Sequence, residues 1–84
     1  MGIPLVMMLV AQELQDSRVP CKAVRVSQDA TEVITIRVQW GGNDSSIFRV
    51  SKHDQLQASS DFVLTEYIMR SVRTMIEERK RANR

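Results

Sequence analysis

The chain has 84 residues, of which 43% are hydrophobic and 26% are charged. This length provides one domain, residues 1–84, with a single core, and the composition is globular rather than disordered. Twelve Lys and Arg against ten Asp and Glu leave a net charge of +2, too small to demand a nucleic-acid partner. The single cysteine excludes an internal disulfide, which fits a cytoplasmic protein.

Residues 1–11 are strongly apolar, yet they predict a helix rather than a targeting segment. They lack the basic start and the small-residue cleavage site of a signal peptide. The apolar run ends at Gln12, well short of the ~20 residues that span a bilayer, so we expect no export signal and no membrane span. Pro4 suits the first turn of a helix, which should run to about Ser17. Its core face should consist of apolar residues at helical spacing: Ile3, Val6, Met7, Val10 and Leu14.

Three strands are predicted after Pro20, which ends the helical stretch. The first covers residues 21–27 and includes Cys21 as an inert packing residue. The second covers residues 32–40, where apolar and polar side chains alternate most clearly. The third covers residues 45–51. Turns are expected at residues 27–31 and at residues 41–44, where Gly and Asn tolerate a positive φ.

The alternation also predicts how the strands pair, because opposed residues of an antiparallel pair share a face. Trp40 should point toward the core with the other apolar strand residues. On this inner face the expected neighbours are Val38 with Phe48, Ile36 with Val50, Val26 with Ile34, and Val24 with Ile36.

The same parity gathers three arginines on the outer face of the sheet. Arg37 should lie opposite Arg49, with Arg25 diagonal to Arg37. Like charges in such positions repel each other, so this face is the candidate site for an acidic protein partner. The complete candidate site is Arg25, Arg37, Arg49, Gln39 and Ile47. Two alternatives stay open: Glu32 or a helix carboxylate neutralises the arginines, or a shift in register separates them.

Two helices are expected after the sheet. Ser51 has the character of an N-cap for a short helix ending near Ala58, and residues 59–61 offer a second N-cap. The last helix should run from about Asp61 to Arg81, and its length of about 30 Å exceeds a three-stranded sheet. Its apolar residues form two neighbouring lines: Leu64, Ile68, Val72 and Met75, and Phe62, Met69 and Ile76.

Both long helices carry more apolar surface than a small sheet covers. The excess predicts a homodimer interface or a groove for a partner protein, where flexible methionines adapt to the contact. The candidate residues are Leu5, Met8, Leu9, Met69 and Ile76. The alternative is that the two helices pack side by side and bury this surface between them.

The basic end of the last helix supports a second hypothesis, contact with phosphates. Its candidate residues are Arg79, Lys80 and Arg81. The alternative is that they complement the helix dipole, with Glu77 paired to Arg81. The order of helix, three strands and helix resembles double-stranded RNA-binding domains in topology only, and a shared topology does not establish a function. The resemblance does not extend to their basic motif, because Asp61-Phe62-Val63-Leu64 stands at the start of the last helix.

No residue pattern indicates catalysis. His53 is the only histidine and stands in a polar turn between Lys52 and Asp54, so a small enzyme working at His53 is the least favoured alternative. One His and one Cys far apart in sequence do not provide a metal site, and Gly41-Gly42 lacks the lysine of a phosphate-binding loop. We therefore expect neither a cofactor nor an enzyme.

The sequence thus predicts an α+β fold in two layers, a three-stranded antiparallel meander packed by an N-terminal helix and a long C-terminal helix. It favours a small non-enzymatic accessory, adaptor or inhibitor protein that acts through protein–protein contacts as a homodimer. Its size and composition resemble those of such proteins in phages and mobile elements. The alternative is a nucleic-acid-binding regulator that uses the basic sheet face and the basic helix end.

Overall fold

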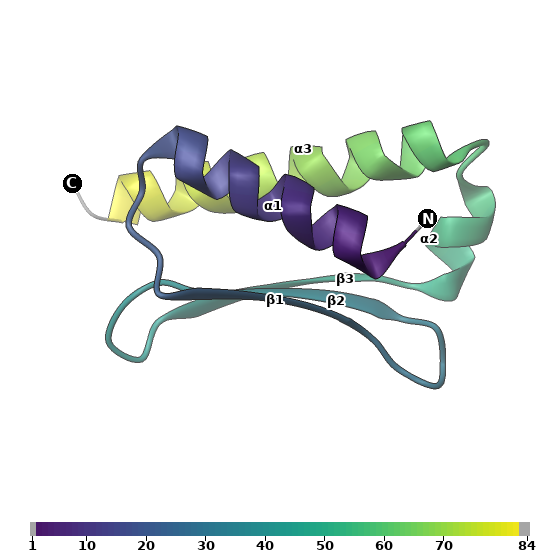
Figure 1. Ribbon diagram of the computed structural model, residues 1–84, viewed down its shortest axis with the longest axis horizontal. Helices are drawn as coiled ribbons and strands as arrows, with labels where there is room; N and C mark the ends of the chain where they lie inside the picture. The colour runs from purple at the N-terminus through teal and green to yellow at the C-terminus, as the bar shows by residue number, and fades with distance from the viewer. Residues whose placement is uncertain (1, 83–84) are drawn as a thin grey trace.

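The computed structural model describes residues 2–82 and confirms the predicted α+β fold (Figure 1). The elements are α1 (Ile3–Ser17), β1 (Ala23–Gln28), β2 (Ile34–Gln39), β3 (Ser45–Val50), α2 (Lys52–Gln57) and α3 (Asp61–Ala82). The strands form one antiparallel sheet in the order β1-β2-β3. Among residues 2–82, no helix is both long enough and apolar enough to cross a membrane.

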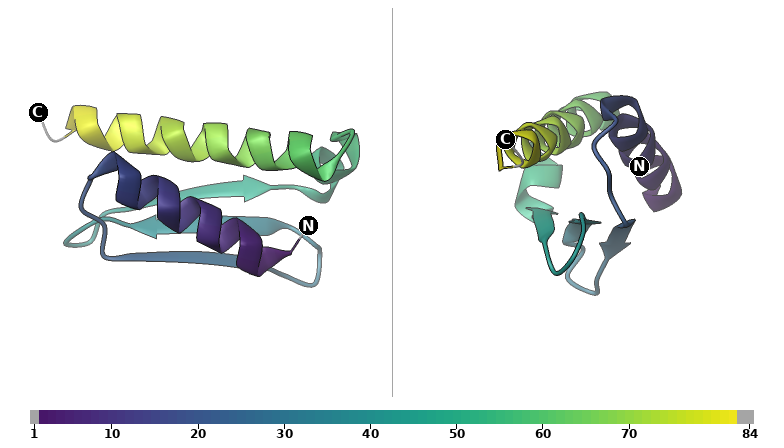
Figure 2. Two further views of the ribbon diagram at one scale, coloured as in Figure 1. Left: turned by 45° about the horizontal axis from the view of Figure 1, so that its top comes forward. Right: turned by 90° about the vertical axis from the view of Figure 1, so that its left-hand side faces the viewer.

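Both long helices lie on one face of the sheet, which leaves the opposite face uncovered (Figure 2). α1 packs against β1 and α3, and α3 also contacts β3. The short helix α2 lies at the end of the sheet, between β3 and α3 (Figure 1). The core between the layers is centred on side chains that are almost fully buried: Val10, Ile36, Val38, Val50, Ile68 and Val72.

Local hydrogen bonds explain where the last two helices begin. The Ser51 hydroxyl accepts a hydrogen bond from the Asp54 amide at 3.1 Å and caps α2, as predicted. The Ser60 hydroxyl accepts one from the Val63 amide at 3.2 Å at the start of α3. α1 begins one residue before the predicted Pro4, and its C-cap is Arg18, which has a left-handed φ of 60°.

The predicted faces of the strands are confirmed, but the predicted register is wrong by two residues in both strand pairs. On the outer face Arg25 pairs directly with Arg37, whereas Arg49 pairs with Thr35. A shift of two residues keeps each side chain on its predicted face, because side chains alternate with a period of two. The observed inner pairs are Val26 with Ile36, Val24 with Val38, Ile36 with Phe48, and Ile34 with Val50.

The first turn explains one of these shifts, because it covers residues 29–33 and so lies two residues further along the chain than predicted. The Asp29 carboxylate accepts hydrogen bonds from the amide and hydroxyl of Thr31 and from the Val33 amide. Glu32, at a φ of 65°, donates its amide to the Asp29 carbonyl at 3.0 Å. β2 therefore starts at Ile34 rather than at residue 32.

We predict that this turn responds to acid through Asp29. The hydrogen bond from the Thr31 hydroxyl, helped by those from two backbone amides, lowers the pKa of Asp29 below its ordinary value of 3.8. Because the pKa is lowered, these bonds stabilise the fold above that ordinary pKa and are lost as the pH falls through the folded-state pKa. Replacing Thr31 with valine should raise the pKa of Asp29 in an NMR titration, and an unchanged pKa would contradict this assignment.

The second turn is tied to the end of α3. The Trp40 amide donates to the Asp44 carbonyl at 3.0 Å, and Gly42 takes a positive φ of 59° that suits glycine. Asp44 Oδ2 lies 3.0 Å from Arg79 Nη1, and the Arg79 guanidinium lies 5.9 Å from the centre of the Trp40 ring. Trp40 is itself buried and donates its indole N–H to the Ser46 hydroxyl at 2.8 Å. Through these contacts the end of α3 and the second turn together cover Trp40 at this end of the core.

Loss of the Arg79 contact should destabilise the protein. We expect Arg79→Ala to lower the free energy of unfolding by about 1–2 kcal/mol, because this side chain is only 20% exposed and lies over Trp40. Lys80→Ala is the matched control, since Lys80 Nζ lies 3.5 Å from Glu77 Oε1 in a surface pair that contributes about 1 kcal/mol or less. Urea unfolding followed by the fluorescence of Trp40 measures both variants. Equal losses would show that the Arg79 contact is not structural.

Several side chains differ from their predicted exposure. Met7 was expected in the core and is 43% exposed, and Phe62, on the predicted second apolar line of the last helix, is 74% exposed. Met69 and Ile76 were expected at an interface and are buried in the core. Cys21 was expected to pack in a strand, but it is exposed and precedes β1.

The contact between α1 and α3 accounts for the differences on α3. Arg73 Nε lies 3.0 Å from Glu13 Oε1, so the second half of α1 packs beside the middle of α3. Met69 and Ile76 lie four residues before and three residues after Arg73, so they share the face of α3 that contacts α1, and both are core residues. Figures 1 and 2 show that the two helices lie farther apart at their starts than further along. Phe62 lies in the first turn of α3 and is exposed.

Candidate partner-binding site

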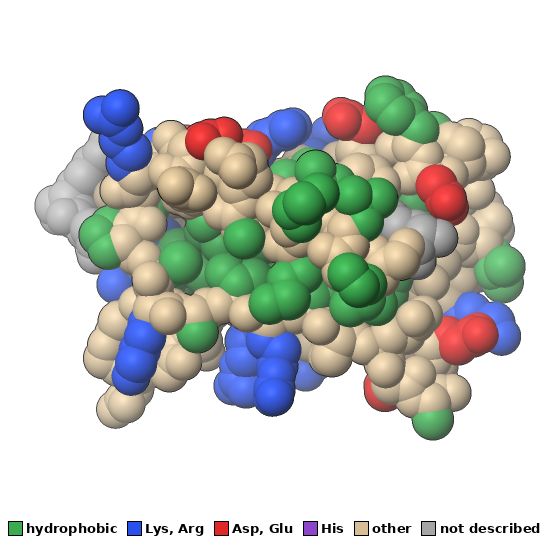
Figure 3. All heavy atoms as spheres, viewed as in Figure 1, with side chains coloured by type: hydrophobic (Ala, Val, Ile, Leu, Met, Phe, Trp, Pro, Cys, Tyr) green, Lys and Arg blue, Asp and Glu red, His purple; other side chains and the backbone are tan. Residues whose placement is uncertain are grey.

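The candidate site lies on the uncovered face of the sheet, where each of the three strands contributes one arginine. Arg25 on β1, Arg37 on β2 and Arg49 on β3 are all exposed. None of the three strands contains an Asp or Glu. In the space-filling view, Lys and Arg side chains project below the sheet, away from the band of hydrophobic side chains between the layers (Figure 3). We call the surface formed by Arg25, Arg37, Arg49, Gln39 and Ile47 the arginine face.

The acidic residues of the two turns are engaged elsewhere. Asp29 is held within the first turn. Glu32 Oε2 lies 2.8 Å from Lys52 Nζ, and Asp44 pairs with Arg79. Within residues 2–82, the three arginines of the sheet have neither an ion pair nor a hydrogen bond from their side chains. The alternative that Glu32 neutralises the arginine face is therefore wrong.

Two of the arginines occupy directly opposed positions in the sheet. Arg25 and Arg37 are direct partners across β1 and β2, a position in which Cβ atoms are about 4.5–5.5 Å apart and like charges destabilise the pair. Arg49 lies diagonal to Arg37 on the next strand. An anion bound at this pair would replace repulsion with charge-assisted hydrogen bonds.

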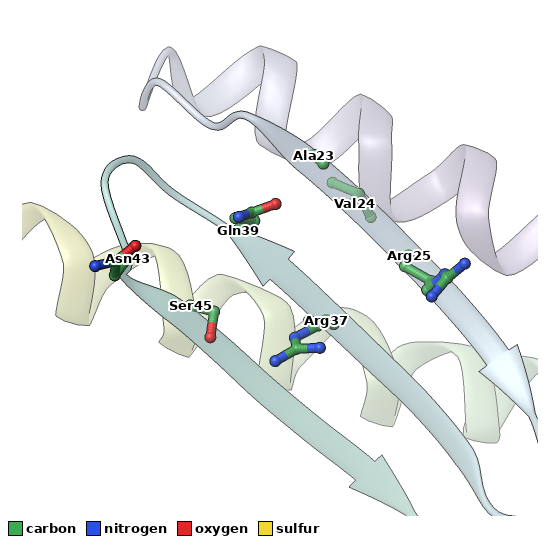
Figure 4. Close-up of a pocket in the computed structure, with 7 residues that line it drawn as sticks. All are labelled: Ala23, Val24, Arg25, Arg37, Gln39, Asn43 and Ser45. Atoms are coloured by element: carbon green, nitrogen blue, oxygen red, sulfur yellow. The ribbon is translucent and has the colours of Figure 1, made fainter.

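A hollow of about 470 Å³ lies over part of the arginine face (Figure 4). Its positive end is formed by two arginines from adjacent strands, and its neutral end lies near the second turn. The lining residues are Arg25 and Arg37; Gln39, Asn43 and Ser45; and Ala23 and Val24. Guanidinium, amide and hydroxyl groups donate hydrogen bonds, and none of these lining residues is a carboxylate, histidine or cysteine. The hollow is thus equipped to bind an anion.

The structure brings three of the five predicted partner-binding residues into the hollow: Arg25, Arg37 and Gln39. Ile47 pairs with Arg37 and is 42% exposed, so it lies on the same face outside the hollow, as does Arg49.

Sequence reasoning missed Asn43 and Ser45. Ser45 has the same parity as Arg49 along β3, so alternation alone could have placed it on the outer face. Asn43 lies in the turn, where alternation carries no signal.

The predicted phosphate contacts are only partly accessible. Arg79 is largely buried against Trp40 and paired with Asp44, which leaves little of its guanidinium for a phosphate. Lys80 is half-buried and pairs with Glu77, which replaces the predicted pair of Glu77 with Arg81. Arg81 is exposed, on the helical side of the molecule.

The predicted apolar interface is reduced to the start of α1. Leu5 and Met8 are 47% and 60% exposed, and Leu9 is half-buried against the core. Met69 and Ile76 are unavailable to a partner because they are core residues. His53 is exposed on α2. Within residues 2–82, no three His, Cys, Asp or Glu side chains are grouped so as to hold a metal ion.

Comparison of the chain with protein-family models, with curated proteins and with solved structures gives no match. A function for this chain therefore has to be argued from the arginine face itself.

Proposed function

We propose that this protein is a small non-enzymatic accessory, adaptor or inhibitor protein whose arginine face engages an acidic surface of a partner protein. The observation that carries the proposal is that, within residues 2–82, no carboxylate pairs with the three exposed arginines of one sheet face. A carboxylate of the partner would relieve the repulsion between Arg25 and Arg37. Complementary charge of this kind also speeds encounter and fixes the orientation of the complex.

The arginine face fits a protein better than a nucleic acid. Single-stranded nucleic acids are bound by stacking bases on exposed aromatic rings, whereas Trp40 is buried and Phe48 is half-buried on the inner face. The basic helix end adds little, because Arg79 and Lys80 already pair with carboxylates of this chain. Ile47 offers an exposed apolar contact of the kind that protein interfaces bury.

The proposal is tested by capture of partners from a nuclease-treated lysate of the cells that produce the protein. Three baits are compared: the wild type, the double variant Arg25→Gln with Arg37→Gln, and the control Arg70→Gln with Arg81→Gln, which removes the same charge from α3. We expect a protein that the wild type and the control retain and the arginine-face variant loses. Capture that does not depend on Arg25 and Arg37 contradicts the proposal. Capture that disappears with nuclease instead favours the nucleic-acid-binding regulator.

Self-association is a further prediction and rests on α1. We expect a dimer in sedimentation velocity, because exposed Leu5 and Met8 are apolar side chains without a covering element. The double variant Leu5→Ser with Met8→Ser should be monomeric. Leu56→Ser is the matched control, since Leu56 is also exposed but lies on α2. A monomeric wild type contradicts the homodimer.

A further inference from the structure

The hollow over the arginine face has two chemically different ends, which carry information about its ligand. Arg25 and Arg37 lie at one end, and Gln39, Asn43 and Ser45 lie toward the second turn (Figure 4). The arginine end alone is sufficient to attract negative charge, so the neutral end indicates a second kind of contact with the ligand. We infer that the hollow seats an extended acidic segment of the partner protein, with one carboxylate at the arginine end and its neighbouring peptide groups at the neutral end. This inference rests on the proposed function and specifies its ligand.

The arginine end suits a carboxylate. Arg25 and Arg37 are direct cross-strand partners that both line this end of the hollow, and each of their guanidinium groups can bind one carboxylate. A guanidinium binds a carboxylate through two parallel hydrogen bonds, which fixes orientation as well as position. Asp44, the acidic residue of the second turn, is held by Arg79 at 3.0 Å and so does not occupy this place.

The neutral end suits peptide groups rather than phosphates. The amides of Gln39 and Asn43 each donate and accept hydrogen bonds, as does the hydroxyl of Ser45. A peptide group offers both a donor and an acceptor, whereas a phosphodiester offers only acceptors. If a nucleic acid backbone were bound there, the acceptor oxygens of the neutral end would therefore receive no hydrogen bond from it.

The spacing of the two ends matches an extended chain. Arg37 and Gln39 alternate on the outer face of β2, a separation of about 6.6–6.8 Å. Alternate residues of an extended peptide have the same spacing, so a carboxylate at Arg37 places the groups two residues along at Gln39. The volume of the hollow, 470 Å³, lies within the range of about 300–1,000 Å³ found for ligand sites.

The test is an NMR titration of the full chain with four probes. They are the blocked heptapeptide Thr-Ser-Glu-Ser-Glu-Ser-Thr, the same peptide with Gln in place of Glu, inorganic phosphate, and a short oligothymidylate, all at one ionic strength. The readouts are the side-chain N–H signals of Arg25, Arg37, Gln39 and Asn43. We expect the Glu peptide to shift all four signals saturably and to bind at least about threefold more tightly than the other three probes.

Variants decide whether the neutral end takes part. Gln39→Ala with Asn43→Ala should weaken the Glu peptide about threefold or more and leave phosphate binding unchanged, and Asn43→Ala alone should show part of that loss if the double variant is unstable. If the neutral-end variants bind the peptide normally while Arg25→Gln with Arg37→Gln does not, the peptide seat is wrong and the proposed function stands. If the arginine variant also binds normally, both are wrong. Tighter binding of phosphate or oligothymidylate overturns the inference as well.

Discussion

Replacing Ile36 with alanine should lower the free energy of unfolding by about 2–5 kcal/mol. Ile36 lies on the central strand, is fully buried and is one of the largest side chains of the core. Truncation removes its burial and leaves a cavity that the packed layers cannot close. For a domain of this size the loss is a large part of a total stability of about 5–15 kcal/mol. Urea unfolding monitored by circular dichroism measures it.

Ile47→Ala is the matched control for this prediction, because it makes the same substitution on the opposite face of the sheet. Ile47 is 42% exposed, so its loss should lower stability by about 1 kcal/mol or less. If Ile36→Ala is too unstable to measure, Ile36→Val should give a graded loss of about 0.5–1.5 kcal/mol. Equal losses at the two positions would show that the sheet is covered on the other face.

Reversing the charge of Arg37 should have the largest effect on partner binding. We expect Arg37→Glu to weaken the captured acidic partner at least tenfold, about 1.4 kcal/mol, because a carboxylate would then face the partner's carboxylates. Folding should be unaffected or improved by about 0.2–1 kcal/mol, since the new carboxylate lies opposite Arg25. Calorimetric titration with the purified partner gives the affinity, and thermal unfolding gives the stability.

Arg70→Glu is the control for this reversal, because Arg70 is exposed on α3 and the change in net charge is the same. Binding by the wild type should also weaken as salt is raised, since exposed charges are screened. A variant at Arg37 that unfolds would show that this arginine is structural. A partner that tolerates Arg37→Glu but not Arg70→Glu would place the binding surface on the helices.

The faces of the strands could be predicted from the sequence, but their register could not. Alternation along residues 34–39 assigns each side chain to the core or to the outer face, and a shift of two residues leaves that assignment unchanged. Register depends on where each turn falls in the sequence. The first turn is held at residues 29–33 by hydrogen bonds to the Asp29 carboxylate, which the periodicity of the sequence does not indicate.

For the candidate site, the positions of the arginines could be predicted from the sequence, but their lack of partners and the hollow could not. Parity alone placed Arg25, Arg37 and Arg49 together. These arginines lack ion-pair partners within residues 2–82 because the nearby carboxylates bind other groups. Asp44, for example, pairs with Arg79, which is 35 residues away in the sequence. That long-range contact also removed Arg79 from the predicted phosphate site. The hollow itself required the turn that places Asn43 beside the strands.

The arrangement of layers explains why the sheet rather than the helices carries the candidate site. Both long helices cover the apolar face, and their mutual contact buries Met69 and Ile76, so little of the predicted helical interface remains. The opposite sheet face has no covering element (Figure 2). It presents rigid, hydrogen-bonded strands, on which charged side chains are positioned more firmly than on loops.

The most direct test of the arginine face is a charge-reversal cycle with the purified partner. Calorimetry compares the wild type and Arg37→Glu, each against the native partner and against a partner in which one contacting carboxylate is replaced by lysine. Opposite charges face each other again when both sides are reversed, so binding lost in each single variant should return in the double variant. Unchanged affinity of Arg37→Glu for the native partner, or no recovery with any lysine-substituted partner, would contradict the claim that this face binds an acidic protein.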